Sequence, residues 1–429
     1  MTAISRRGVL AGLGLGALSG VAGCGGGPRG LVRVAVVFSG LELTSFRRVL
    51  DAFTRRYGVA VDVVSLGSDI GALLGNRLAR DVADVMFLPR PGMVHQYQDQ
   101  LVTLDPGLAD AYPTGWQQLV KAGDRELGVW FKSAHKSLVW YRPDIFDEVG
   151  VSPPPDWPSW MQLNQKLIGA GIAPLALGAA SGWVLTDWVE NVLLCLDAEA
   201  YRQLANQGRG WRAPAVGQTL QLLGEMWGTP GALRGGVNRA LLTEFEQSIV
   251  DVFTDRRAAM IFEADFVYSV INQLAAPDAQ FHWFPFPIPP QGQHRVVVGG
   301  DVAVLLRPAT ASGQLLIAWL ASAEAAMIWA QLGGFTSVNQ DVPNSVYPPD
   351  YPMSDPRLLA EVRAGNHGLI DFDMSDQLLG PLAGGEGHGE WAILQQFLRD
   401  VGTTGGDHQL VAAVVARTVN TLATVAGEA

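Results

Sequence analysis

The chain has 429 residues, more than a single hydrophobic core usually holds, so two compact units are expected. Hydrophobic residues make up 48% and charged residues 17%, which is typical of a globular protein and excludes a disordered one. Lysine and arginine total 30 against 41 aspartate and glutamate, and this acidic balance argues against nucleic acid as a partner.

The N-terminal residues have the pattern of an export signal. The pair Arg6-Arg7 precedes residues 11–23, which are small, apolar and free of charge. This run is too short to span a bilayer as a helix of the mature chain. Cys24 follows Val-Ala-Gly, as in a lipobox, where the cysteine is lipidated; an ordinary signal peptide with an incidental cysteine is the alternative. We expect a twin-arginine signal peptide at 1–23 and a flexible tether at 24–30.

An alternation of strands and helices follows the tether. Apolar strands are expected at 32–38, 59–64 and 83–88, separated by helical spacing at 46–57 and 71–80. This β-α-β-α-β order predicts a parallel sheet, whose ligands bind outside the carboxyl ends of the strands.

Residues 127–141 are rich in aromatic and β-branched side chains and predict one long strand, which could belong to two domains. Pro143 stops this strand, and residues 145–149 form a short amphipathic turn of helix. A proline-rich extended loop then leads to a helix that begins near Ser159.

The second half of the chain alternates in the same way. A helix is expected at 161–170, a strand at 173–177 and a helical region at 197–257. Cys195 lies in an apolar run, so we expect a buried, inert thiol and no disulfide.

Several motifs resemble a known family. KSLVWY, IFDEVGV and DWPSW, which begin at Lys136, resemble the crossover of family 1 extracellular solute-binding proteins, the ligand-capturing subunits of ABC importers. GW-x-x-TDW-x-E at 182–190 and GGF-x-S-x-N at 333–339 resemble the branch that binds α-glucosides and other oligosaccharides. The resemblance covers nearly all of 31–420.

The resemblance implies an α/β, two-lobe, periplasmic-binding-protein-like (type II) fold with a ligand cleft between the lobes. The first lobe would comprise residues 31–135 and 300–340, and the second residues 136–299 and 341–429.

The resemblance also implies ligand-binding residues. Glu42 and Arg90 occupy branch positions in two loops of the first lobe, although a helix N-terminal acid and a surface salt bridge are the respective alternatives. Trp183 is expected on a loop that faces the cleft, ahead of a helix capped by Thr186 or Asp187. An indole covers the apolar face of a sugar ring, while acids and arginine bind its hydroxyls. The remaining candidates are His135, Asp187, Glu263, Asp265, Asp301, Phe335 and Asp373.

Glu263 and Asp265 stand where many relatives of the branch carry Gly-Trp or Cys-Trp. The departure leaves two interpretations open, because these acids could bind sugar hydroxyls or an amino or cationic group of a different ligand. A helix N-cap is a third possibility for Asp265.

The expected protein is therefore a monomeric lipoprotein on the extracytoplasmic face of the cell membrane. It would capture an oligosaccharide, such as an α-glucoside, and present it to ABC permease subunits, without a cofactor. The seven histidines are scattered and predict no metal site. The alternatives are a non-transport envelope scaffold, a binder of an amino sugar or glycerophosphodiester, and, least favoured, a glycoside hydrolase, for which no nucleophile motif is present.

Overall fold

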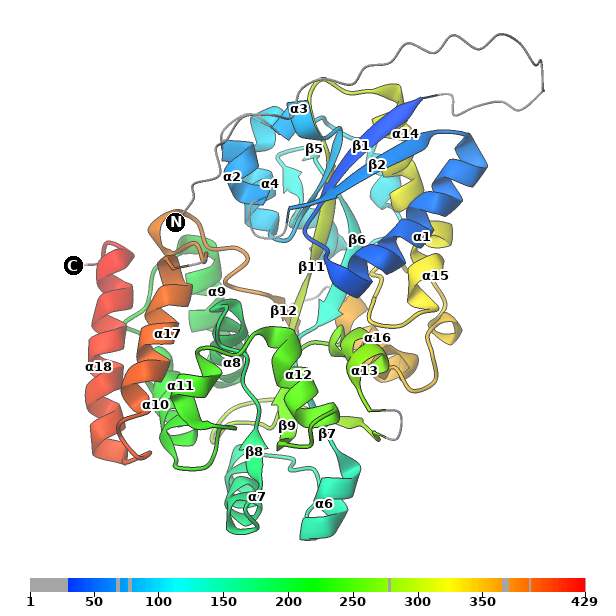
Figure 1. Ribbon diagram of the computed structural model, residues 1–429. Helices are drawn as coiled ribbons and strands as arrows, with labels where there is room; N and C mark the ends of the chain where they lie inside the picture. The colour runs from blue at the N-terminus through cyan, green and yellow to red at the C-terminus, as the bar shows by residue number, and fades with distance from the viewer. Residues whose placement is uncertain are drawn as a thin grey trace, which may run out of the picture.

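The computed structural model describes residues 30–66, 70–75, 79–276, 279–364, 370–385 and 387–428. The predicted signal peptide, the predicted lipidation site Cys24 and all of the predicted tether except Gly30 lie outside the described residues. Figure 1 shows the described chain as two lobes, each built around its own sheet.

The first lobe contains a six-stranded sheet. Five strands follow the order β12-β11-β3-β1-β2, and the sixth, β6, pairs with β11. β1 pairs in parallel with both β2 and β3, so the predicted β-α-β-α-β order is confirmed. The strands are β1 (Leu31–Val36), β2 (Ala60–Ser65), β3 (Val85–Leu88), β6 (Val129–His135), β11 (Val296–Leu305) and β12 (Ile370–Phe372).

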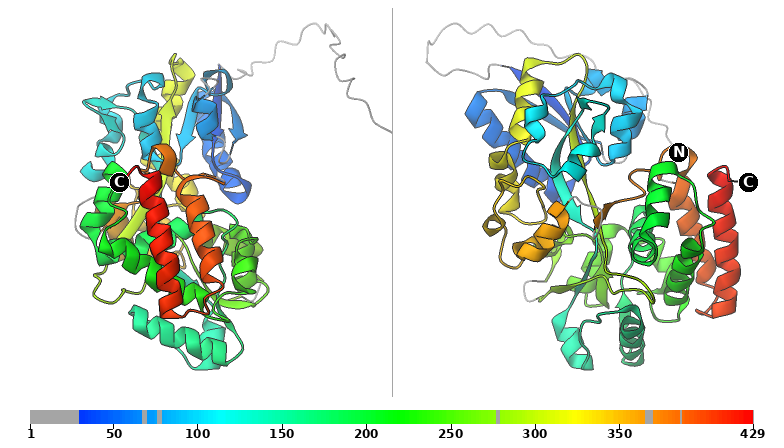
Figure 2. Two further views of the ribbon diagram at one scale, coloured as in Figure 1. Left: turned by 90° about the vertical axis from the view of Figure 1, so that its left-hand side faces the viewer. Right: turned by 180° about the vertical axis from the view of Figure 1, so that it is seen from behind.

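Helices cover both faces of this sheet (Figures 1 and 2). The first buries Phe46, Val49, Leu50 and Phe53, which recur at helical spacing on one side. The helices are α1 (Gly40–Tyr57), α2 (Ile70–Gly75), α3 (Ala79–Val82), α4 (Pro91–Gln96), α5 (Thr114–Gln118), α14 (Ala311–Leu320), α15 (Ala323–Ala330) and α16 (Pro356–Ala364). A small hairpin joins β4 (Lys121–Ala122) and β5 (Arg125–Glu126).

The second lobe contains a four-stranded sheet in the order β10-β7-β9-β8, flanked by helices. Its core includes Trp160 and Trp188, whose rings stack at 5.5 Å. The strands are β7 (Leu138–Tyr141), β8 (Ala173–Leu175), β9 (Ala258–Phe262) and β10 (His282–Pro285). The helices are α6 (Pro143–Val149), α7 (Trp157–Gly169), α8 (Trp183–Leu196), α9 (Ala198–Gln207), α10 (Pro214–Gly228), α11 (Gly236–Ala240), α12 (Phe245–Phe253), α13 (Val267–Leu274), α17 (Gly389–Val401) and α18 (His408–Val425).

The single long strand predicted at 127–141 is in fact two strands in different sheets. The break falls at Lys136 and Ser137, where the chain passes from the first sheet to the second. The Ser137 hydroxyl accepts a hydrogen bond from the backbone of Val297, which lies where β11 carries the chain back. At the hinge, the two chain segments that connect the lobes are therefore joined by a hydrogen bond.

Residues 341–364 were predicted to lie in the second lobe, but their side chains pack in the core of the first. The indole of Trp116 donates to the carbonyl of Val362 at 2.9 Å, and the Tyr347 hydroxyl accepts from the backbone of Ser337. This segment carries large apolar side chains, including Tyr351, that cover the edge near β6.

Cys195 is free and buried, as predicted, and burial raises the pKa of its thiol to about 12. Among the described residues, no single helix has the length and apolar character of a membrane span. α14 and α15 meet these criteria only as a pair, which is bent by 62°.

Candidate functional site

The first part of the site is built around Lys132, in the middle of β6. Its ammonium is bonded to the carboxylate of Glu42, which lies in the first turn of α1. The Lys132 side chain is 7% exposed and that of Glu42 is 32% exposed, so only the glutamate of this ion pair is substantially exposed to solvent. The ammonium also lies 5.6, 5.2 and 5.8 Å from the ring centres of Phe38, Phe266 and Trp329.

The charge of Lys132 is maintained by the acids around it. Burial would lower the pKa of Lys132, but the carboxylates of Glu42 and Asp301 outweigh this effect and raise it. Asp301 pairs with Lys132 across β11 and β6, and burial raises the pKa of its carboxyl to about 7 against the opposing effect of Lys132. The lysine is therefore cationic at neutral pH, whereas Asp301 titrates there.

The second part of the site is centred on Lys136, between β6 and β7. Its ammonium donates to Asp187 on α8 at 3.1 Å and to Asp373, just after β12, at 2.5 Å. Burial raises the pKa of Asp187 to about 7, although Lys136 opposes this shift. Burial would also raise the pKa of Asp373, but Lys136 and other hydrogen-bond donors lower it below its usual value. Lys136 thus connects α8 of the second lobe to two segments that join the lobes, the one between β6 and β7 and the one after β12.

Three carboxylates of this cluster have the spacing of a metal site. Ligand oxygens of Asp187, Glu190 and Asp373 lie within 4.8 Å of one another, and hard cations prefer such oxygens. The Lys136 ammonium is bonded to two of the three, and Glu190 accepts hydrogen bonds from the Tyr201 hydroxyl and from two backbone amides. The Lys136 ammonium therefore occupies the position that a metal ion would take among these carboxylates.

Trp183 was predicted on a loop, but it is the first residue of α8. The residue before it, Gly182, is the N-cap and fits against Trp391, which a side chain at position 182 would overlap. The Trp183 ring is half-buried, and its centre lies 5.2 Å from that of Phe245 and 6.2 Å from that of Phe266. Asp187 consequently lies inside the helix and does not cap it.

Arg90 joins the lobes at another point. Its guanidinium donates to the carbonyl of Gly384 at 2.9 Å, and Gly384 lies in the loop that precedes α17 of the second lobe. Arg90 itself is half-buried just before α4. It contacts the opposite lobe directly, so the alternative of a simple surface salt bridge does not apply among the described contacts.

His135 and Phe335 lie in the core of the first lobe and not on a ligand-facing surface. His135 is 1% exposed, and its ring bonds to Glu361 of α16 at 3.2 Å. Phe335 is fully buried and stacks on Trp329 at 5.1 Å. The side-chain direction of neither residue could be predicted from a strand or loop assignment.

Glu263 and Asp265 are also buried. Asp265 lies between β9 and α13 of the second lobe. It accepts hydrogen bonds from the hydroxyls of Thr336 and Tyr351 of the first lobe, at 2.5 and 2.8 Å, and so connects the two lobes. The predicted alternative of a helix N-cap is wrong, because α13 has no side-chain cap. Burial followed by the charge of Asp187 raises the pKa of Glu263 well above its usual range.

Sequence reasoning missed Lys132 and Lys136, the two cations of the site. Both lie in the segment FKSAHK, within the stretch 127–141, which has no other lysine and no arginine, aspartate or glutamate. A lysine in a strand buried on both faces must be paired with an acid, and this was the available signal.

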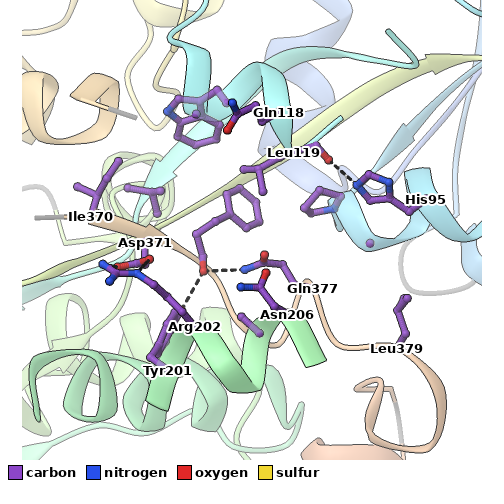
Figure 3. Close-up of a pocket in the computed structure, with 17 residues that line it drawn as sticks. His95, Gln118, Leu119, Tyr201, Arg202, Asn206, Ile370, Asp371, Gln377 and Leu379 are labelled. Atoms are coloured by element: carbon purple, nitrogen blue, oxygen red, sulfur yellow. Dashed lines mark hydrogen bonds and ion pairs between the residues drawn. The ribbon is translucent and has the colours of Figure 1, made fainter. Parts of the chain in front are cut away.

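A cavity of about 460 Å³ lies elsewhere between the lobes (Figure 3). It is bounded by α4 and α5 of the first lobe, by α9 of the second and by β12. Arg202 and Asp371 line it and form a bidentate ion pair, with nitrogen–oxygen distances of 2.8 and 2.9 Å. Trp116 and Phe372 provide apolar walls. None of the ten predicted ligand-binding residues lines this cavity.

The chain is similar to two curated proteins over most of its length. It is 29% identical over 369 residues to the osmoprotective compounds-binding protein GgtB of Synechocystis sp., with 82% of this chain and 86% of that protein covered. It is 25% identical over 363 residues to the alpha-glucosides-binding periplasmic protein AglE of Rhizobium meliloti, with 79% and 78% covered.

Solved structures share the fold at lower identity. A chitin oligosaccharide binding protein superposes with a TM-score of 0.73 at 14% identity, covering 92% of this chain and 99% of that one. The bacterial solute receptor AcbH gives 0.71 at 17% identity with the same coverage. The fold is therefore the predicted type II, two-lobe fold. Residues 39–327 match the model of the bacterial extracellular solute-binding proteins, and the chain belongs to that family.

Proposed function

We propose that this protein captures a carbohydrate, an oligosaccharide or α-glucoside, between its lobes and delivers it to ABC permease subunits for import. Family membership and the names of the two curated relatives support this proposal. The bound carbohydrate would be held, not altered, since the family is one of binding proteins.

The observation that carries the proposal is the chemistry at the lobe boundary. The half-buried indole of Trp183 offers a flat apolar surface, and the ion pair of Lys132 with Glu42 offers charged hydrogen-bonding groups beside it. A sugar has apolar ring faces and a polar edge, and it needs both kinds of partner. Phe266 lies next to both Trp183 and Lys132, so the two kinds of group adjoin.

Lobe closure would be the working step. A ligand that contacts both lobes shifts the protein toward the closed form by its differential affinity for that form. Arg90, which already reaches the second lobe, would be one of the groups that act across the boundary. A micromolar dissociation constant, about 8 kcal/mol, would be ordinary for such a receptor.

We also propose where in the cell the protein is located. The pair Arg6-Arg7 and the lipobox ending at Cys24 support export and anchoring on the extracytoplasmic face of the membrane, as a monomer. Metabolic labelling with a fatty acid, in the wild type and in Cys24→Ala, would test the anchor.

The test of ligand binding is a thermal-shift screen with maltose, trehalose and a panel of di- and trisaccharides, followed by calorimetry on any ligand found. We expect Trp183→Ala to weaken binding at least about tenfold and to leave the melting temperature nearly unchanged. Trp211, fully buried in the second lobe, supplies the control, since Trp211→Ala should lower the melting temperature. Equal effects of both substitutions on melting would mean that Trp183 is a core residue.

A further inference from the structure

The rings around Lys132 form a cation-binding cage. Phe38 follows β1, Trp329 lies on α15 and Phe266 precedes α13, and all three ring centres are within 6 Å of the ammonium. Proteins hold ligand cations such as quaternary ammonium groups with this arrangement. Here the cation belongs to the protein itself.

We propose that Lys132 is a specificity-determining residue that permanently occupies a cation subsite of the ligand site and thereby restricts that site to ligands without a cationic group. The inference rests on the proposed function and specifies its ligand class. It also decides between the interpretations left open by the acids of the site, in favour of an uncharged carbohydrate over an amino sugar.

The backbone places Lys132 in the cage by an irregularity of β6. The pairing with β11 shifts between Asp301, opposite Lys132, and Val302, opposite Trp130, which leaves Phe131 as an extra residue. Neighbouring side chains of a regular strand point to opposite faces. Phe131 and Lys132 instead both lie against Trp329, at 6.1 and 5.8 Å. The bulge thus turns the lysine toward the rings.

The charges around the cage favour a cation. The carboxyl groups of Glu42, Asp301 and Asp265 all act on Lys132, and Glu42 is bonded to it. Without the lysine, three acidic groups and three rings would surround one position. A tethered ammonium competes with a free one at a high effective concentration, since linkage makes its binding intramolecular. The cationic group of a ligand is therefore kept out of the cage for as long as Lys132 is present.

The two lobes share the cage, because Phe266 follows β9 of the second lobe while Phe38 and Trp329 belong to the first. The subsite is consequently complete only where the lobes meet. The ammonium of Lys132 thus contacts rings of both lobes, and a ligand that binds beside it would meet both lobes, as the proposed closure requires.

The experiment removes the lysine and supplies a cation. Choline is the probe, and its control is the neutral alcohol in which a tert-butyl group replaces the trimethylammonium. We expect no choline binding to the wild type, and choline binding to Lys132→Ala at least about tenfold tighter than binding of the neutral alcohol, measured by calorimetry. Lys121→Ala is the control, because this lysine is also paired with an acid, Glu126 at 3.5 Å, but has no ring contact among the described residues.

Absence of choline binding to a folded Lys132→Ala, or equal binding of the neutral alcohol, would overturn the inference. Lys132→Gln, which removes the charge but keeps most of the side-chain volume and so still fills the cage, provides a second variant that should bind choline no better than the wild type. Unfolding of both variants would count against the inference too, since it would make Lys132 a structural counter-ion. These outcomes are independent of the saccharide screen with the wild type, so failure of the proposed function is recognised separately.

Discussion

Replacing Lys136 by methionine keeps the length of the side chain but removes the charge that pairs two buried carboxylates. Asp187 and Asp373 have side chains that are 1% and 0% exposed, and that of Lys136 is 13% exposed. Removing one partner of a buried pair leaves an uncompensated charge and costs about 3–5 kcal/mol. We therefore expect Lys136→Met to lose about that much free energy of unfolding near pH 8.

The loss should depend on pH in a defined direction. The folded pKa of Asp187 is raised to about 7, so its contribution to stability is present below its unfolded value and lost as pH rises through 7. Removal of Lys136, which opposes the shift, makes this loss larger. The folded pKa of Asp373 is lowered, so its contribution is present above its unfolded value, and it disappears with the lysine. Both effects make the variant's deficit small near about pH 4 and largest above about pH 7.

Urea unfolding followed by tryptophan fluorescence, at about pH 5 and about pH 8, measures this deficit. Arg417→Met is the control, because its ion pair with Asp400 is 3.7 Å long and solvent-exposed and should be worth less than about 1 kcal/mol. A Lys136→Met variant as stable as the wild type near pH 8, or equally destabilised at both pH values, would refute the account of a buried, charge-dependent hinge.

Three further substitutions test the burial and the backbone geometry of single positions. Burial, followed by the charge of Asp373, raises the pKa of Glu390 to about 8, and neither of its carboxyl oxygens has a hydrogen-bond partner. Glu390→Gln should therefore match the wild type near about pH 5 and be more stable near about pH 8, whereas a loss at pH 8 would show that the carboxylate is needed. A side chain at Gly300 would overlap the carbonyl of Lys132, so Gly300→Ala should lower stability by about 1–3 kcal/mol. Gly217→Ala on α10, where the added methyl meets nothing within 4 Å, should raise stability by up to about 1 kcal/mol, and similar melting temperatures for the two glycine variants would contradict the strand geometry.

Local pattern was sufficient for much of the fold. Apolar runs and helical spacing predicted the alternation from β1 to β3, and the aromatic stretch 127–141 predicted an extended segment that could belong to two domains, which the structure divides into β6 and β7. These features are decided by the periodicity and backbone preferences of neighbouring residues, which a sequence displays directly. The apolar run around Cys195 likewise predicted its burial.

The site depended on contacts that no local pattern contains. Lys136 meets partners 51 and 237 residues away, and the direction of Lys132 depends on one extra residue in the pairing of two strands. A shift of one residue reverses the face of a strand, so the sequence could not tell that His135 points to α16 and Lys132 to the rings. The sequence by itself determined which elements form and in which order. The tertiary structure decided which charges meet between the lobes, because burial and pairing of charges are set by residues far apart in the chain.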